Sequence, residues 1–487
     1  MFSINKTIKT KIHMEDKTTR RGFLKKSSLA VAGMTVAGIA NNAAAAPLVD
    51  SKKRVLGAND KIRVGFIGVG NRGTQLLHLF MEQPDCEVAG LCDVYEPYVT
   101  RDYNAVIDRY KKDMGNRIPK MGEQFSSKVK LYSDYRKMLD DKNIDAVCIA
   151  TPDHWHALQT IDAINAGKDV FVEKPLSKTI AEGRRMVEVG NSSRQVITVG
   201  LNRRGAPSFQ KLAKEVTAGK IGQVTFASAC HVSNMYPNGI GKLQPETPPN
   251  DFDWDMWLGP RAFRPYQYNI APYMFRWWED YANQISNNGI HYLDLIRWMI
   301  NEDAPLAVSA HGGKFVIDDD RTIPDTMQVT YEFKSGVLVT LTILEASSGS
   351  FIPHGFLELR GTKGTLYTGE NDYKIVPTNA GQFQTWKPMI EPEDYSIEND
   401  DTLLIDGSYK NSASSLIRNF LDCVKSRNQP WATLEIGHRS TSMAHMGTIA
   451  MMTKERLEWD SVNERFTNSD TANKYLSYDY RKPWELF

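Results

Sequence analysis

A short glycine-rich turn between a strand-like run and a helical pattern constrains the fold of this chain more than any other feature. Residues 61–67 are strand-like, the turn GVGNRG follows at 68–73, and a helix-like segment runs on from it. Further apolar strands alternate with helical segments as far as residue 203. This alternation is typical of a parallel sheet covered on both faces by helices. We therefore expect an α/β fold with a Rossmann domain over residues 61–203.

The glycine spacing in this turn is the dinucleotide fingerprint in its proper context. Gly68 permits the tight turn, Gly70 lets a diphosphate approach the backbone, and Gly73 lets helix and strand pack closely. Asp93 follows Gly73 by twenty residues, at the end of the second predicted strand. A carboxylate there accepts hydrogen bonds from ribose hydroxyls and repels a 2′-phosphate, which favours NAD. Arg72 is able to reach such a phosphate, so NADP is the alternative.

Polar residues end two further strands of the predicted parallel sheet. Thr151-Pro152 follows the run DAVCIA, and Glu173-Lys174-Pro175 follows DVFV. In open parallel sheets ligands bind outside the carboxyl ends of the strands, so both breaks lie on the cofactor side. Pro175 holds the backbone of Lys174 extended. A lysine fixed there is able to donate to a substrate hydroxyl, and partial desolvation would lower its pKa toward a catalytic range.

The pattern changes after residue 203. A helix and a long alternating strand come first, then an irregular segment at 234–286 dense in Trp, Tyr and Pro. Its aromatic side chains either stack on sugar faces or pack the segment onto the domain. An amphipathic helix near residues 289–300 and several alternating strands follow. We expect residues 204–487 to form an α/β domain with an open, mostly antiparallel sheet for substrate binding and oligomerisation.

The amino terminus is typical of an export signal. Arg20 and Arg21 precede a weakly apolar Ala- and Gly-rich run that ends in the small residues 43–46. This indicates a twin-arginine signal over residues 1–46, with an ordinary secretory signal or a basic helix as alternatives. Residues 47–60 form a polar linker, and Met14 is an alternative start to Met1. We expect a periplasmic or otherwise exported protein.

Composition narrows the choice of partners. The chain has 59 basic and 58 acidic residues, so charge gives no reason to expect nucleic acid as a partner. We expect no membrane span after signal removal, because no apolar stretch of about 20 residues follows the signal.

The five cysteines show no C-x-x-C spacing and mostly adjoin apolar residues, which indicates buried free thiols. His154 and His156 lack an accompanying set of ligands, so we predict no metal site.

Several motifs in order resemble one known family. The glycine turn is followed by ATPDHWH, AGKDVFVEKP, GLNRR and finally G-x-H-x-x-D in GIHYLD. This order resembles the Gfo/Idh/MocA oxidoreductases, dehydrogenases of sugars, inositols and related polyols. DWDMWLGP and the closing YRKPWEL resemble an exported branch of that family. The resemblance covers the chain from about residue 61 to its end.

The resemblance to this family implies which residues form the active site. The lysine of E-K-P and the histidine of G-x-H face the nicotinamide in the family, which points to Lys174 and His291. Many members carry an aspartate where this chain has Asn287; since Asn cannot take a proton, His291 is the expected base and Lys174 its electrostatic partner. The predicted cofactor residues are Gly68, Gly70, Asn71, Arg72, Gly73, Asp93, Thr151, Pro152, His156, Glu173 and Lys174. The predicted substrate residues are Arg203, Asn287, Asp294 and Trp277.

We therefore expect an NAD(P)-dependent oxidoreductase of a sugar or glycoside, with a tightly bound cofactor. Oxidation at C3 is the specific form considered, because a 3-keto sugar has an acidified C2 hydrogen and is primed for elimination. An electron acceptor or a partner lyase and a homo-oligomer are the expected associations. One alternative is an NAD-dependent glycosidase acting by oxidation and elimination; relatives of that type lack the E-K-P lysine, so Lys174 favours the dehydrogenase. The other is a non-catalytic sugar-binding protein.

Overall fold

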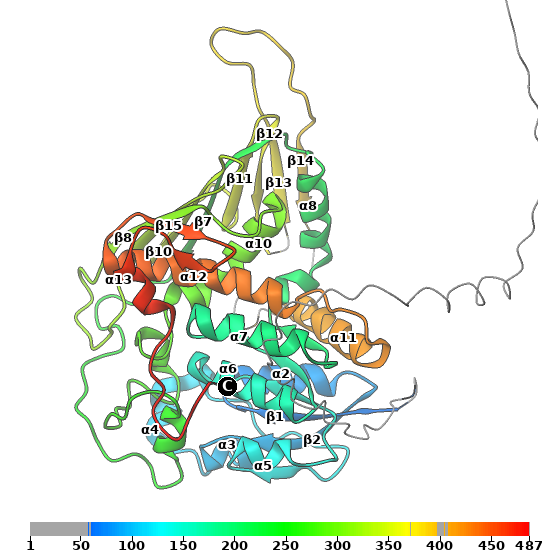
Figure 1. Cartoon of the computed structure of the whole chain (residues 1–487), viewed down its shortest axis with the longest axis vertical. Helices are drawn as coiled ribbons and strands as arrows, with labels where there is room; N and C mark the ends of the chain where they lie inside the picture. The colour runs from blue at the N-terminus through cyan, green and yellow to red at the C-terminus, as the bar shows by residue number, and fades with distance from the viewer. Residues whose placement is uncertain (1–56, 58–59, 371, 397–403, 405–407, 487) are drawn as a thin grey trace, which may run out of the picture. The chain divides into compact units, whose positions relative to one another are not determined.

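The computed structural model describes residues 57, 60–370, 372–396, 404 and 408–486 (Figure 1). The predicted signal at 1–46 and nearly all of the linker at 47–60 lie outside these residues. Among the described helices, none is both long and apolar enough to cross a bilayer. All five cysteines are buried free thiols, as predicted.

The first sheet is parallel and has six strands in the order β3-β2-β1-β4-β5-β6. The strands are β1 (Ile62–Ile67), β2 (Cys86–Cys92), β3 (Lys130–Tyr132), β4 (Ala146–Ile149), β5 (Asp169–Val172) and β6 (Ile197–Val199). The central strands are buried almost throughout because helices cover both faces. The strand order reverses between β1 and β4, where such sheets open a crevice at their carboxyl ends.

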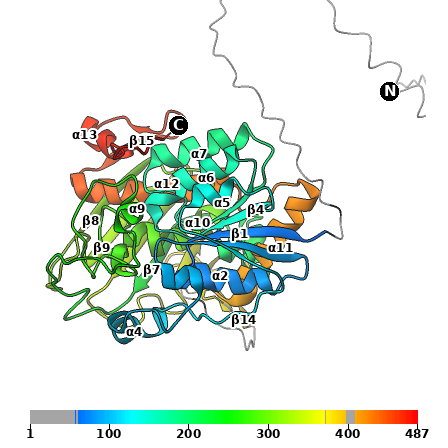
Figure 2. The same ribbon diagram turned by 90° about the horizontal axis from the view of Figure 1, so that it is seen from below.

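The connections of this sheet supply its helices. They are α2 (Asn71–Met81), α3 (Glu96–Thr100), α4 (Asp108–Met114), η1 (Gly115–Arg117), α5 (Tyr135–Leu139), α6 (Asp153–Asn165) and α7 (Ile180–Asn191). Figure 2 shows α2 on one side of β1, and α6 with α7 on the other. α7 begins with a capping box, in which Thr179 and Glu182 satisfy each other's backbone N–H groups. The Rossmann fold is therefore confirmed.

The second sheet has ten strands in the order β14-β13-β12-β11-β7-β10-β9-β8-β15-β16. Its strands are β7 (Val224–Val232), β8 (Ala307–Gly313), β9 (Thr326–Glu332), β10 (Leu338–Leu344), β11 (Leu357–Gly361), β12 (Gly364–Thr368), β13 (Asp372–Pro377), β14 (Glu393–Ser396), β15 (Leu457–Asp460) and β16 (Arg465–Phe466). β7 and β10 pair in parallel, whereas the other neighbours are antiparallel. The mostly antiparallel sheet is confirmed.

The remaining helices follow β6 in the chain, and some of them pack on the first core while others pack on the second sheet. They are η2 (Asn202–Gly205), α8 (Pro207–Thr217), α9 (Trp254–Leu258), η3 (Met274–Trp277), the π-helix η4 (Ile285–Gly289), α10 (Ile290–Ile300), α11 (Lys410–Ser426), α12 (Leu434–Thr453), α13 (Asp470–Asn473) and η5 (Lys474–Leu476). η4 and α10 are consecutive, so a wide turn of backbone precedes the regular helix. This π-turn carries Asn287.

Two late segments of the chain return to the first core. α11 places Phe420 against Phe80 of α2 and Phe171 of β5, with ring centroids 6.3 and 5.8 Å apart. The C-terminal tail then brings Trp484 to Trp155 of α6, with centroids 4.8 Å apart. In Figure 1 the red tail runs from α13 down to α6. The wall of the first sheet is thus completed by residues far away in sequence.

Candidate active site

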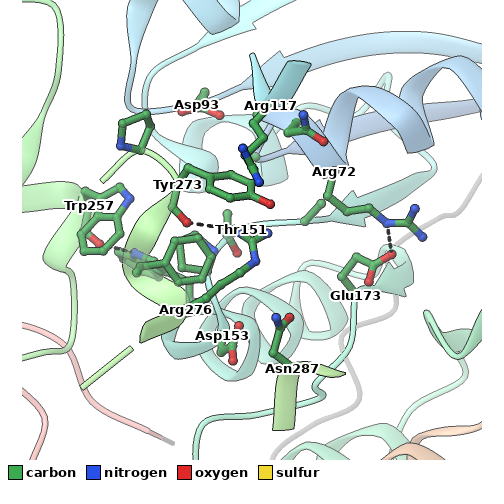
Figure 3. A pocket seen from close by; sticks show the side chains of 18 of the residues that line it. Arg72, Asp93, Arg117, Thr151, Asp153, Glu173, Trp257, Tyr273, Arg276 and Asn287 are labelled. Carbon is green, nitrogen blue, oxygen red and sulfur yellow. Dashed lines mark hydrogen bonds and ion pairs between the residues drawn. The ribbon is translucent and has the colours of Figure 1, made fainter. Parts of the chain in front are cut away.

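A cavity of about 390 Å³ lies at the carboxyl ends of the parallel strands. One wall is the glycine turn and the ends of β2, β4 and β5; the other comes from β7, η3, η4 and the end of β10 (Figure 3). This volume is within the usual range of ligand sites, about 300–1,000 Å³. The cavity therefore joins the predicted cofactor side to residues of the second sheet.

The glycine turn leaves room for a ligand, not for side chains. Gly68 has φ +83°, and a Cβ there would lie 2.8 Å from the carbonyl carbon of Ala150. A Cβ on Gly73 would lie 1.9 Å from the oxygen of Gly68. Gly70 differs, because a Cβ there would meet only the Tyr98 ring, at 3.8 Å, on the cavity side. Gly70, Asn71 and Arg72 at the start of α2 line the cavity, and the amino terminus of a helix suits a dinucleotide diphosphate.

Asp93 lines the cavity, and its carboxylate accepts hydrogen bonds from the surrounding backbone. Its Oδ2 accepts from the N–H of Val69 at 2.8 Å, and its Oδ1 accepts from the N–H groups of Val94 and Tyr95. The carboxylate therefore ties the glycine turn to the end of β2, beside the place where a ribose would bind.

Arg72, the residue that made NADP the alternative cofactor, donates hydrogen bonds to protein side chains. Its Nε donates to Oε1 of Glu173 at 2.8 Å, and both side chains are almost fully buried. Its Nη1 donates to Gln75. Asn71 donates to the carbonyl of Asn116, which draws the η1 segment over the turn. Arg72 and Glu173 therefore form one buried pair at the cavity wall, and the predicted direct cofactor contacts of this pair remain predictions.

The Thr151-Pro152 break is held by α6. Thr151 donates through its hydroxyl to Gln159 at 2.6 Å, and its carbonyl lies 2.8 Å from Nε2 of His156. The other ring nitrogen of His156 lies 2.7 Å from the carbonyl of Pro175. Thr151 and Pro152 line the cavity, whereas His156 is buried behind them and absent from the lining. His156 thus joins the two strand-end loops.

Lys174 and Asn287 meet in the cavity. Nζ of Lys174 donates to the carbonyl oxygen of Asn287 at 2.8 Å and to its Oδ1 at 3.2 Å. One residue comes from the end of β5 and the other from the π-turn η4, and both line the cavity. The amide therefore fixes the lysine without removing its charge.

The predicted base His291 is placed differently. It lies one turn after Asn287, in α10, is 3 % exposed, and does not occur among the cavity-lining residues. Of the predicted substrate residues, Trp277 lines the cavity and donates through Nε1 to Glu345 at 2.9 Å.

Arg203 and Asp294 lie outside the cavity lining. Asp294 forms a buried ion pair with Arg204 at 2.8 Å and accepts from Ser440 at 2.7 Å. Arg203 pairs with Glu370 and lies over the Phe356 ring. These contacts join η2 to α10, α12 and the residues that flank β11 and β12, and the predicted substrate roles of Arg203 and Asp294 remain predictions.

Three cavity residues carry chemistry that the sequence analysis did not single out. Asp153 begins α6 and is 6 % exposed. Burial, with the charges of Arg203 and Lys174, lowers the pKa of His231 to about 4. Burial raises the pKa of Glu345 to about 7, against the opposing hydrogen bonds from Trp277 and Arg321. Asp153 begins α6 shortly after β4, and Glu345 directly follows β10, so both lie near strand ends, as Lys174 does.

Most of the Trp and Tyr side chains named below, from the segment at 234–286, are buried against other parts of the protein. Trp254 stacks on Trp257 with centroids 4.8 Å apart, and Tyr266, Trp278 and Tyr281 are buried. The aromatic residues of this segment that line the cavity are Phe252, Trp257, Tyr273, Phe275 and Trp277. His154 donates through Nε2 to the carbonyl of Trp257 at 2.9 Å, and burial lowers its pKa to about 3. Within the described ranges no cluster of three metal-ligating side chains occurs.

The parallel sheet, the glycine turn and the cavity beside it define a dinucleotide-binding Rossmann protein with a second α/β domain. Residues 62–201 match the model of the oxidoreductase family with an NAD-binding Rossmann fold, and residues 208–385 and 408–486 match its C-terminal α/β domain. The chain therefore belongs to the Gfo/Idh/MocA oxidoreductase family. The family supports NAD as cofactor, and the open glycine turn fits it.

Among curated relatives, the chain is 29 % identical over 223 residues to an α-N-acetylgalactosaminidase of Shewanella oneidensis, covering 44 % of this chain. The match spans 46 % of that relative, so the chain spans about half the length of the curated relatives it matches. Among solved structures, a probable dehydrogenase from Thermotoga maritima has a TM-score of 0.53 at 22 % identity, covering 82 % of this chain and 98 % of that one. Levoglucosan dehydrogenase with NADH and levoglucosan has a TM-score of 0.58 at 16 % identity, covering 82 % and 99 %. These structures establish the fold.

Proposed function

We propose that this protein is an exported NAD-dependent oxidoreductase that converts a ring hydroxyl of a sugar or glycoside, at C3 in its specific form, into a ketone. The observation that carries the proposal is Lys174, which lies between the glycine-turn wall and the second sheet and is held there by Asn287. A fixed ammonium is suited to stabilise the alkoxide that forms as the hydroxyl loses its proton.

The cavity walls suit a sugar beside a dinucleotide. Gly68, Gly70 and Asp93 would hold the diphosphate and ribose; when bound, the nicotinamide supplies the hydride acceptor. Trp277 brings an aromatic ring to the cavity lining, and the C–H faces of sugars stack on such rings, whereas the Tyr273 ring lies under Arg276 and Arg117. Levoglucosan dehydrogenase, a structural neighbour, acts on a carbohydrate, which supports this substrate class.

Export of the protein would determine how its cofactor is acquired and re-oxidised. The Arg20-Arg21 signal indicates passage of an already folded protein, so the cofactor would be loaded inside the cell and held tightly. Re-oxidation in place would then need a second sugar, a keto acceptor or an electron carrier.

A redox-neutral glycosidase is the second candidate, because curated relatives include an α-N-acetylgalactosaminidase and glycosyl hydrolase family 109 proteins. It would oxidise the sugar, eliminate the glycosidic bond, add water and reduce the product again. The retained Lys174 favours the dehydrogenase. Free monosaccharide without net change in cofactor would reverse this ranking.

The test uses protein recovered from the periplasmic fraction of cells that express the full chain. Denaturation should release NAD(H), and a panel of glycosides should change cofactor fluorescence and give keto sugars. Lys174→Ala should lower keto-sugar formation by about 10²–10³-fold with the cofactor retained, since one electrostatic donor is lost. Lys168→Ala is the matched control, because Lys168 lies just before the opposite end of β5 and donates to carbonyls there. Absence of released cofactor, or full activity of Lys174→Ala, contradicts the proposal.

A further inference from the structure

We propose that Asp153 is the group that takes the proton from the substrate hydroxyl during oxidation. This inference rests on the proposed function and assigns a role to a residue that the sequence motifs left unused. It places the proton acceptor at the start of α6, shortly after β4, and β4 pairs with β5, just beyond whose end Lys174 lies. Figure 3 labels Asp153 among the side chains of the cavity.

The first observation is an unsatisfied carboxylate on the cavity wall. Asp153 is the first residue of α6, it is 6 % exposed, and it lines the cavity. Its Oδ2 is enclosed and makes no hydrogen bond within the described part of the chain. Buried polar groups are nearly always paired, and a buried carboxylate without a partner is costly. A ligand hydroxyl in the cavity would supply the missing partner.

The surroundings of Asp153 tune it for proton transfer. Burial raises the pKa of Asp153 above its ordinary value of 3.8, and the charges of His156, Lys174, Lys178 and Arg276 oppose this rise. These groups come from α6 itself, the loop after β5 and η3. The amino terminus of the 13-residue α6 also favours the carboxylate form. A carboxylate with a raised pKa is a stronger base than an exposed one.

The other titratable groups of the cavity are less suited to accept this proton. Lys174 donates two hydrogen bonds to Asn287, as an ammonium does. Glu345 already accepts from Trp277 at 2.9 Å and from Arg321 at 2.7 Å. The lowered pKa of His231 makes that imidazole a weak base. The two other carboxylates of the lining are also engaged: Asp93 accepts from three backbone N–H groups, and Glu173 accepts from Arg72 and from the N–H of Lys174. Asp153 is the lining carboxylate with an enclosed oxygen that accepts no hydrogen bond within the described residues.

Oxidation of one hydroxyl to a ketone removes a proton from the oxygen and a hydride from the carbon. The O–H bond breaks and its proton joins the Asp153 carboxylate to form the carboxylic acid. The C–H bond on the same carbon would break with its electron pair leaving on the hydrogen as hydride, and a bound oxidised nicotinamide would supply the acceptor for it. The C=O bond forms, with Lys174 beside the oxygen. In the reverse direction the Asp153 carboxylic acid returns the proton to the alkoxide.

The first measurement is the pH profile of keto-sugar formation by the purified holoprotein. Activity should fall at low pH as Asp153 becomes protonated, with the fall above the range of an ordinary aspartate. Asp153→Asn should lower the rate by about 10²–10⁴-fold and remove this acidic limb, with bound NAD(H) retained. Asp153→Glu should restore part of the rate. His291→Gln is the competing arm, because His291 is the base that the motifs predict.

The second measurement is independent of activity. Because the pKa of Asp153 is raised in the folded state, its contribution to stability falls as pH rises from about 3.8 through the raised value. Asp153→Asn removes that cost, so the variant should melt at a higher temperature than wild type at about pH 8, with the gain shrinking toward pH 4. Asp141→Asn, outside the cavity lining, is the control: hydrogen bonds from Lys130 and Tyr132 hold the pKa of Asp141 below its ordinary value against the effect of burial, so this variant should be destabilised at about pH 8.

The outcomes separate the two proposals. If wild type oxidises glycosides and Asp153→Asn keeps the rate and acidic limb while His291→Gln loses them, Asp153 is not the acceptor. An Asp153→Asn variant that is inactive and also less stable than wild type at about pH 8 overturns the inference, since it indicates a structural role. If wild type oxidises no glycoside, the proposed function fails and the inference fails with it.

Discussion

Two glycines of one turn have separate tasks. A Cβ on Gly73 would overlap the oxygen of Gly68 at 1.9 Å, whereas a Cβ on Gly70 would make ordinary contact with Tyr98 at 3.8 Å. Gly70 also has φ −67° and ψ −159°, which other residues adopt readily. We expect Gly73→Ala to lower the free energy of unfolding by about 3 kcal/mol, because backbone must move. Gly70→Ala should fold normally but bind cofactor roughly tenfold more weakly, equal to about 1.4 kcal/mol.

Urea unfolding of cofactor-free protein and titration with NAD check this pair of glycine variants. Each variant is the control for the other, since both add one methyl group to the same turn. Equal loss of stability in the two variants would contradict the division of tasks. So would full NAD affinity in Gly70→Ala.

Single residues were predictable where their chemistry depends on a strand end. Lys174 was found in this way, and the structure pairs it with Asn287. Asp153 and Glu345 stand in equivalent places, but what distinguishes them is tertiary: one lacks a partner and the other is held by Trp277 and Arg321. The amino-acid sequence around Asp153 and Glu345 indicates neither the missing partner of the first nor the hydrogen bonds to the second. The same limit applies to His291, which the π-turn η4 precedes and which is absent from the cavity lining.

Among the elements, the C-terminal tail has the clearest separate role. Trp484 meets the Trp155 ring edge-on, and Arg136 lies 5.0 Å over the Trp484 ring. Trp155 lines the cavity and donates to the carbonyl of Trp257 at 3.0 Å. The tail therefore supports one cavity wall from behind. The sequence analysis identified the closing YRKPWEL by resemblance alone and did not predict this contact, because it joins residues far apart in the chain.

We expect Trp484→Ala to lower the free energy of unfolding by about 2 kcal/mol, less than a fully buried tryptophan, because Trp484 is half-buried. Cofactor affinity should fall as well, since Trp155 loses its neighbour. Trp431→Ala is the matched control: Trp431 is 43 % exposed, and its change should stay within about 0.5 kcal/mol. Chemical denaturation with NAD titration measures both. A neutral Trp484→Ala would show that the tail does not support the wall.

At the scale of the whole molecule, the first core is not built from one stretch of sequence. Phe80, Phe171 and Phe420 form an edge-to-face cluster, and the third member comes from α11. Asp85 is bound by Arg418 and Lys425, and these hydrogen bonds lower its pKa to about 2 against the effect of burial. Periodicity predicts the six strands and their helices, but not which distant helix covers them. That choice is made by packing.

This arrangement predicts that residues 61–203 will not fold by themselves. Without α11 the apolar faces of Phe80 and Phe171 lose their cover, and Asp85 loses both cationic partners. The isolated fragment should show no cooperative transition on heating, whereas the full chain should. In the full chain, Phe420→Ala should lower the free energy of unfolding by about 4 kcal/mol, because this ring is fully buried. A fragment that melts cooperatively and binds NAD would show that the first sheet is stable without the later helix.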